Sequence, residues 1–338
     1  VLKSDGTDIS WGTISAGATF KTFGTSSIMI GDDATGTINA ANYNTALGVD
    51  VFSALTSGDN NTAVGYQALA ANTTGAKNTG VGIDSLKSNT TASNNTAFGA
   101  YTLDANTTGD RNVAIGWAAL SDNVAGDRST ALGFAALQTQ NPSGNADMYN
   151  TAVGYNAGNA ITTGTVNTLV GGLCGDAITT GDSNVALGYL ALSSTTTASD
   201  NTAVGGAALN VNTTGASNVA VGHQALDANT TASSNTAVGA DSLGANTTGA
   251  DNTAVGKGAL QSNTTANNNT AVGQSALDTN TTGSENTAVG VNALDDNVSG
   301  FHNTAVGYAS LSSNTSNYNS AFGYKALEDN TSGERNTG

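Results

Sequence analysis

A five-residue phrase of the type Asn-Thr-Ala-Val-Gly recurs from Asn44 to the last residues of this 338-residue chain. Of the 17 intervals between successive repeat starts, 15 are 17 residues long, one is 21 and one is 16. A short fixed period is typical of a one-dimensional stack, in which each unit buries its apolar side only against its neighbours. The repeat therefore predicts a solenoid, and it argues against an enzyme.

Each repeat is numbered here from its first Asn as position zero. Position +4 is Gly in all 17 complete repeats, position +3 is always apolar, and position +8 is Leu in 14 repeats. Position +7 is nearly always small, and position +11 is usually Asn, followed by Thr-Thr-Gly or Thr-Thr-Ala. The apolar residues do not recur at helical spacing, and the glycines and β-branched residues also oppose a helix.

The segment from 0 to +5 alternates like a β-strand, with +1, +3 and +5 on one face and +2 and +4 on the other. We expect a second short strand at the Ala-Leu pair, and a turn at the Asn-Thr-Thr-Gly tract. The predicted fold class is all-β: a parallel β-roll or β-solenoid of 17-residue coils that associates as a homotrimer.

Equal positions stack in such a fold, which assigns structural roles to particular columns. We expect apolar ladders at +3 and +8, polar ladders at 0 and +11, and glycines at +4 that take a positive φ or allow close backbone approach. Representative residues of these columns are Val64, Leu69, Leu226, Asn61, Asn229, Gly65, Gly116 and Gly239.

A single coil carries too few large apolar side chains to make a lone chain robust. The Ala and Gly residues at +2 and +4 form a face with little bulk. We therefore expect this small-residue face to point to the axis of a homotrimer.

The chain divides into an N-terminal adaptor or cap over 1–43 and a repeat region over 44–338, which we expect to be truncated at its C-terminus. The coils in 129–183 are irregular. The 21-residue repeat holds an insertion around Pro142, which becomes a loop in a solenoid. The next two coils carry Gly158 and Gly175 where Leu is usual, with Ile161 and Ile178 three positions later, so the apolar residue has moved.

Composition excludes several function classes. The chain has 9 Lys and Arg against 25 Asp and Glu, a formal charge of −16, so it lacks the basic footprint of a nucleic-acid binder. No apolar run is long enough for membrane insertion.

The sequence shows no metal or cofactor site. The two histidines lie at unrelated repeat positions, and the acidic residues before repeat starts do not follow the pattern of calcium-binding β-rolls. We therefore expect solvated turns and no cofactor or metal. The lone Cys174 is interpreted as a buried small residue.

Aromatic residues gather at +5, and they are the candidate surface contacts together with the insertion: Tyr66, Trp117, Tyr155, Tyr189 and Pro142. Lone surface aromatics can stack on sugars, and filling space between chains or coils is an equally good interpretation. Regular Thr arrays also occur on ice-binding solenoids, although the variable residues at +5, +6 and +9 do not make a flat Thr-only face.

The segments Asn112–Gly116, Asn184–Gly188 and Asn218–Gly222 resemble the Ser-Val-Ala-Ile-Gly repeat of YadA-like trimeric adhesin heads, which implies a left-handed β-roll of three chains. The whole phrase, with its Asn-Thr-Thr-Gly tract, is similar to repeats in tail-fibre and virion structural proteins of bacteriophages, notably marine cyanophages. Leu2–Gly12 is similar to a segment of such phage proteins.

This resemblance implies a non-enzymatic fibre segment in a phage tail fibre or a similar appendage. It would act as a rigid spacer or host-attachment element on the virion, with itself and a host-surface glycan or protein as partners. A bacterial surface adhesin stalk is the first alternative, and an ice-binding β-solenoid is the second.

Overall fold

The computed structural model describes residues 2–4, 9–11, 19–21, 27–31 and 40–338. All regular elements among these residues are strands, and none of the described segments is helical. The chain separates into two compact units, Val1–Tyr149 and Asn150–Gly338, which are described one at a time.

The strands of the first unit are β1 (Leu2–Ser4), β2 (Ile9–Trp11), β3 (Thr19–Lys21), β4 (Ile28–Gly31), β5 (Thr45–Gly48), β6 (Thr62–Val64), β7 (Thr79–Val81), β8 (Thr96–Phe98), β9 (Val113–Ile115), β10 (Gly126–Asp127), β11 (Thr130–Leu132) and β12 (Ala146–Asp147). Those of the second unit are β13 (Thr151–Val153), β14 (Thr168–Val170), β15 (Val185–Leu187), β16 (Thr202–Val204), β17 (Val219–Val221), β18 (Thr236–Val238), β19 (Thr253–Val255), β20 (Thr270–Val272), β21 (Thr287–Val289), β22 (Thr304–Val306) and β23 (Ser320–Phe322).

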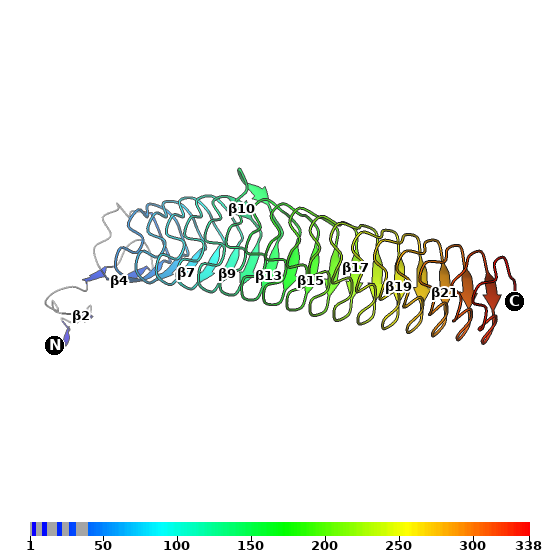
Figure 1. Cartoon of the computed structure of the whole chain (residues 1–338). Helices are drawn as coiled ribbons and strands as arrows, with labels where there is room; N and C mark the ends of the chain where they lie inside the picture. Colours follow the sequence, from blue (N-terminus) through cyan, green and yellow to red (C-terminus); the bar gives the residue numbers. More distant parts are fainter. Residues whose placement is uncertain (1, 5–8, 12–18, 22–26, 32–39) are drawn as a thin grey trace. The chain divides into compact units, whose positions relative to one another are not determined.

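Within each unit, successive coils place their strands side by side in one parallel sheet (Figure 1). The register is strict: Thr236 pairs with Thr253, and Val238 with Val255, and the same positions pair between the other coils. β4 already pairs in parallel with β5, one strand before the first regular repeat. The parallel β-solenoid predicted from the period is therefore confirmed. The cap expected over 1–43 falls largely outside the described residues.

The expectation of two strands per coil is wrong, because each regular coil has one strand of three or four residues and then turns. The +6 and +8 residues both have left-handed backbones, as at Gln67 (φ 53°) and Leu69 (φ 51°), so the Ala-Leu segment cannot be extended. The turns remain bonded to neighbouring coils: the Leu69 N–H donates to the Ser85 carbonyl at 3.0 Å. Coil-to-coil bonding thus continues beyond the strand.

The interior of each coil is narrow, and this corrects the predicted core. Leu69 and Leu226 at +8 are fully buried, as expected. Val64 at +3 is half-exposed, however, whereas Ala63 at +2 is fully buried. The strand therefore turns its Ala side inward and its Thr/Val side outward, because a coil with Leu at +8 leaves space for little more than a methyl group at +2.

The irregular coils confirm the displaced apolar residue. Ile161 and Ile178 are fully buried. A Cβ added at Gly175 would lie 2.8 Å from Ile178 Cδ1 and 2.9 Å from Leu169 Cδ2. Leu169 and Ile178 therefore fill the volume that Leu at +8 fills elsewhere.

The insertion in the first unit is anchored to the two coils before it. β12 pairs in parallel with β10, an ion pair joins Arg128 to Asp147, and the Thr108 hydroxyl donates to Asn145 Oδ1 at 2.8 Å. Pro142 is buried within this insertion, so its assignment as a surface contact is wrong.

Candidate functional surfaces

Two columns of asparagine run through the interior of the coils, as the sequence predicts. The Asn61 N–H donates to Asn44 Oδ1 at 2.8 Å, its Nδ2 donates to the Gly75 carbonyl at 2.9 Å, and its Oδ1 accepts from the Asn78 N–H at 2.9 Å. In the second column, Asn229 Nδ2 donates to Asn212 Oδ1 at 2.9 Å and to the Ala232 carbonyl at 3.0 Å. These amides are buried and bonded to neighbouring coils, so they are structural.

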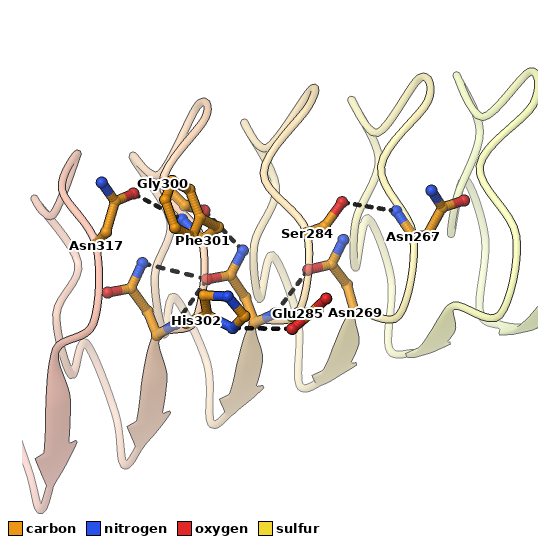
Figure 2. A network of polar contacts seen from close by, with 10 residues as sticks. Asn267, Asn269, Ser284, Glu285, Gly300, Phe301, His302 and Asn317 are labelled. Atoms are coloured by element: carbon orange, nitrogen blue, oxygen red, sulfur yellow. Dashed lines mark hydrogen bonds and ion pairs between the residues drawn. The ribbon is translucent and has the colours of Figure 1, made fainter.

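A third column, at +15, runs along the surface of the turns. In Figure 2 the Asn267 N–H donates to Ser284 Oγ at 3.1 Å, and the Phe301 N–H donates to Asn317 Oδ1 at 3.0 Å. Carboxylates accept in the same way elsewhere: Asp182 Oδ1 accepts from the Thr165 N–H at 2.6 Å. Acidic residues at this position thus bind a backbone amide of the adjacent coil.

The glycines at +4 meet a strict steric requirement. Gly65, Gly116 and Gly239 have φ values of 134°, 126° and 138°. A Cβ added at Gly239 would lie 2.5 Å from the carbonyl oxygen of Gly256 in the next coil. Position +4 therefore excludes any side chain, and its role is to let coils approach closely.

The outward face of the sheet is the most regular exposed surface of each unit. Position +1 carries Thr, Ser or Val and position +3 carries Val, Ile, Leu or Phe, with no charged residue at either. We call the residues at +1, +3 and +5 of each unit its outward strip. Val255 and Val272 remain 37% exposed in this strip, and Phe322 remains 61% exposed. The sequence-based prediction placed the +3 residues in the core and missed this surface, although the variation in side-chain size at +3 could have indicated it.

The aromatic candidates at +5 are exposed, as a surface contact requires. Tyr66, Trp117, Tyr155 and Tyr189 have exposed fractions of 48%, 45%, 56% and 62%. The ring partners of Trp117 are other aromatic residues, Tyr101 and Phe134, and not the remaining candidates.

Those rings come from neighbouring coils of the first unit. Phe134 stacks on Trp117 at 4.7 Å between centroids, and Tyr101 meets Trp117 edge-on at 6.1 Å. The Trp117 ring is therefore in contact with rings of the neighbouring coils, which favours a packing role over sugar stacking at this residue.

Titratable groups at +9 lie half-buried beside the turns. Burial raises the pKa of Asp104, Asp176, Asp227, Asp278 and Asp295 above the usual carboxyl range. Among the described residues, no group of three or more His, Cys, Asp or Glu side chains could hold a metal ion. The sole thiol, Cys174, is fully buried, and burial raises its pKa to about 12.

The two histidines are not brought together. His302 Nδ1 lies 2.9 Å from Glu285 Oε2 in the preceding coil (Figure 2), and its ring stacks on Tyr318 at 5.1 Å. His223 lies at +5 of another coil, with its ring over Gly206. Both histidines therefore contact residues of adjacent coils.

Comparison with known proteins leaves the family open: no family model matches the chain, and no curated protein is significantly similar to it. In the part of the chain that the structure describes, no helix is both long and apolar enough to cross a bilayer.

Proposed function

We propose that this chain is a non-enzymatic structural segment of a phage tail fibre or a similar extracellular appendage. It would act as a rigid spacer or host-attachment element and work as a homotrimer, as the adhesin heads it resembles do. The observation that supports this proposal is the regular bonding between coils within each unit. Backbone bonds and the two buried asparagine columns repeat from coil to coil, as at Asn61 and Asn78.

Such bonding gives a unit whose length is fixed by the number of coils. Each coil adds about 4.8 Å along the stack. A chain built this way separates the two ends of a segment by a defined distance, which is the task of a fibre spacer.

Localisation tests the proposal. Antibodies raised against the recombinant chain are applied to intact particles and cells that carry the gene, and bound antibody is seen by immunogold electron microscopy. Label on particle appendages supports the fibre role. Label on the bacterial envelope would favour a surface adhesin stalk instead, and label confined to the cytoplasm would refute both roles.

The outward strip favours a second candidate function, ice binding. In the second unit, the +1 and +3 positions from β16 to β22 are all Thr or Val, in strict register. The variable +6 and +9 residues follow the strand and lie outside it. The variable +5 residues, among them His223, Lys257 and Tyr308, border the Thr and Val rows within the strip. Thermal hysteresis of the purified chain tests this candidate, and its absence would remove it.

A further inference from the structure

The outward strip of the second unit is an exposed surface without acidic residues on an acidic molecule. The chain has a formal charge of −16, but no Asp or Glu occupies +1, +3 or +5 between Thr151 and Tyr324. Lys257 and His223 are the only residues there that can carry positive charge. Valines at +3 are exposed by 36% to 37% at Val255, Val272 and Val289. An exposed apolar surface of this length marks an interaction site.

We propose that the strip is the surface through which copies of this chain associate, with the three strips of a homotrimer facing a common axis. Only the number of associating chains, three, rests on the proposed fibre role. It replaces the expected association through +2 and +4, because Ala237 is fully buried inside its own coil and Gly239 lies against the next coil.

Charge and period identify the partner as a second copy. Two acidic chains repel one another least through a surface that carries no acidic residue, and the strip is such a surface. A partner must also keep its side chains in step with rows that repeat about every 4.8 Å over the 11 strands β13–β23. Another copy has the same repeat and stays in step along the whole strip.

The dimensions of the strip fit a three-chain core. Packed sheets lie about 10 Å apart, so each contributes about 5 Å of side chain. Three flat faces each about 5 Å from a three-fold axis enclose a triangle with sides of about 17 Å. The +1 to +5 positions, of which only the first three form the strand, span at most about 17 Å.

Sedimentation of the full 338-residue chain tests the inference. We expect wild type at micromolar concentration to sediment as a trimer of 33.2 kDa chains. The double variant Val255→Lys/Val272→Lys adds two charges to the strip and should sediment as a monomer with an unchanged far-UV circular dichroism spectrum. The matched control Thr265→Lys/Thr282→Lys places the same charges at exposed +13 positions and should remain a trimer.

A folded wild-type monomer would overturn the inference, and thermal hysteresis of that monomer would assign the strip to ice. Trimers from both double variants would also overturn it, because association would then use another surface. If Val255→Lys/Val272→Lys unfolds, Val255→Thr/Val272→Thr replaces it; a folded variant that associates no more weakly than wild type would refute the role of these valines. The localisation experiment is independent of these outcomes, so either proposal can fail alone.

Discussion

Replacing one buried asparagine by aspartate should make the stability of the solenoid depend on pH. Asn269, drawn in Figure 2, is fully buried. Its Oδ1 accepts from the Asn286 N–H at 2.9 Å, and its Nδ2 donates to the Gly283 carbonyl at 2.9 Å. In Asn269→Asp the shape is kept, but an ionised carboxylate would place an oxygen against the carbonyl oxygen of Gly283. Only a protonated Asp can restore that hydrogen bond.

The magnitude follows from this requirement. Burial and the facing carbonyl raise the folded-state pKa of the new carboxyl by about 3 units, from about 3.9 to about 7. A raised folded-state pKa of an acid leaves stability unchanged below the unfolded pKa and reduces it as pH rises towards the folded pKa. At about 1.4 kcal/mol per unit, the cost should grow from about 1.5 kcal/mol at pH 5 to about 4 kcal/mol at pH 8.

A matched control lies two residues earlier. Asn267 is exposed, and its Oδ1 accepts from the Ala250 N–H at 2.7 Å, as carboxylates do at this position in other coils. Asn267→Asp should therefore change stability by less than about 0.5 kcal/mol at either pH. Urea unfolding followed by circular dichroism, with wild type as reference at each pH, measures both effects. Equal costs at pH 5 and pH 8, or equal costs at the two sites, would refute the assignment of the interior column.

Three further outcomes follow from burial and backbone geometry. Leu226→Asp should lower the free energy of unfolding, measured in urea, by more than about 4 kcal/mol, because it puts a charge in the buried Leu column. Asp227→Ala should lower it by less than about 0.5 kcal/mol, because burial already disfavours the charged form of that carboxyl group. Gly239→Val should prevent coil stacking, since its Cβ would lie 2.5 Å from the Gly256 oxygen; an unchanged circular dichroism spectrum would contradict this. The Cys174 thiol should resist a thiol reagent at pH 8 until urea unfolds the chain, because burial raises its pKa to about 12.

The period and the composition of the repeat were sufficient to predict the parallel solenoid and the positions that stack. Asn61 and Gly65 have the roles that their repetition indicated, because a stack turns any repeated residue into a column. The inward face of the strand was predicted wrongly. Alternation tells which residues share a face, but it does not tell which face is inside. Which face points inward depends on the width of the coil, and the width cannot be read from a single repeat.

The conformation of the turn after the strand could not be predicted from the sequence either. Leu69 adopts φ 51°, a conformation that costs a non-glycine residue energy and is therefore not expected from propensity. Burial of its side chain and the bond from its N–H to the Ser85 carbonyl compensate for this cost in the folded chain. Both interactions are tertiary and involve the adjacent coil, so they cannot be recognised from local sequence.

Variation in side-chain size along each column does carry information about the interior. Position +2 is Ala in 15 of the 17 complete repeats, whereas +3 varies from Val to Phe. A packed interior tolerates little change in volume, and an exposed surface tolerates much. Of the two exceptions at +2, Gly80 and Leu169, the larger supports this interpretation, because Leu169 enters the interior in the same coil in which Gly175 replaces Leu. The two changes conserve volume inside one coil, as expected if +2 and +8 share one core, and they leave Val170 at +3 on the outward strip.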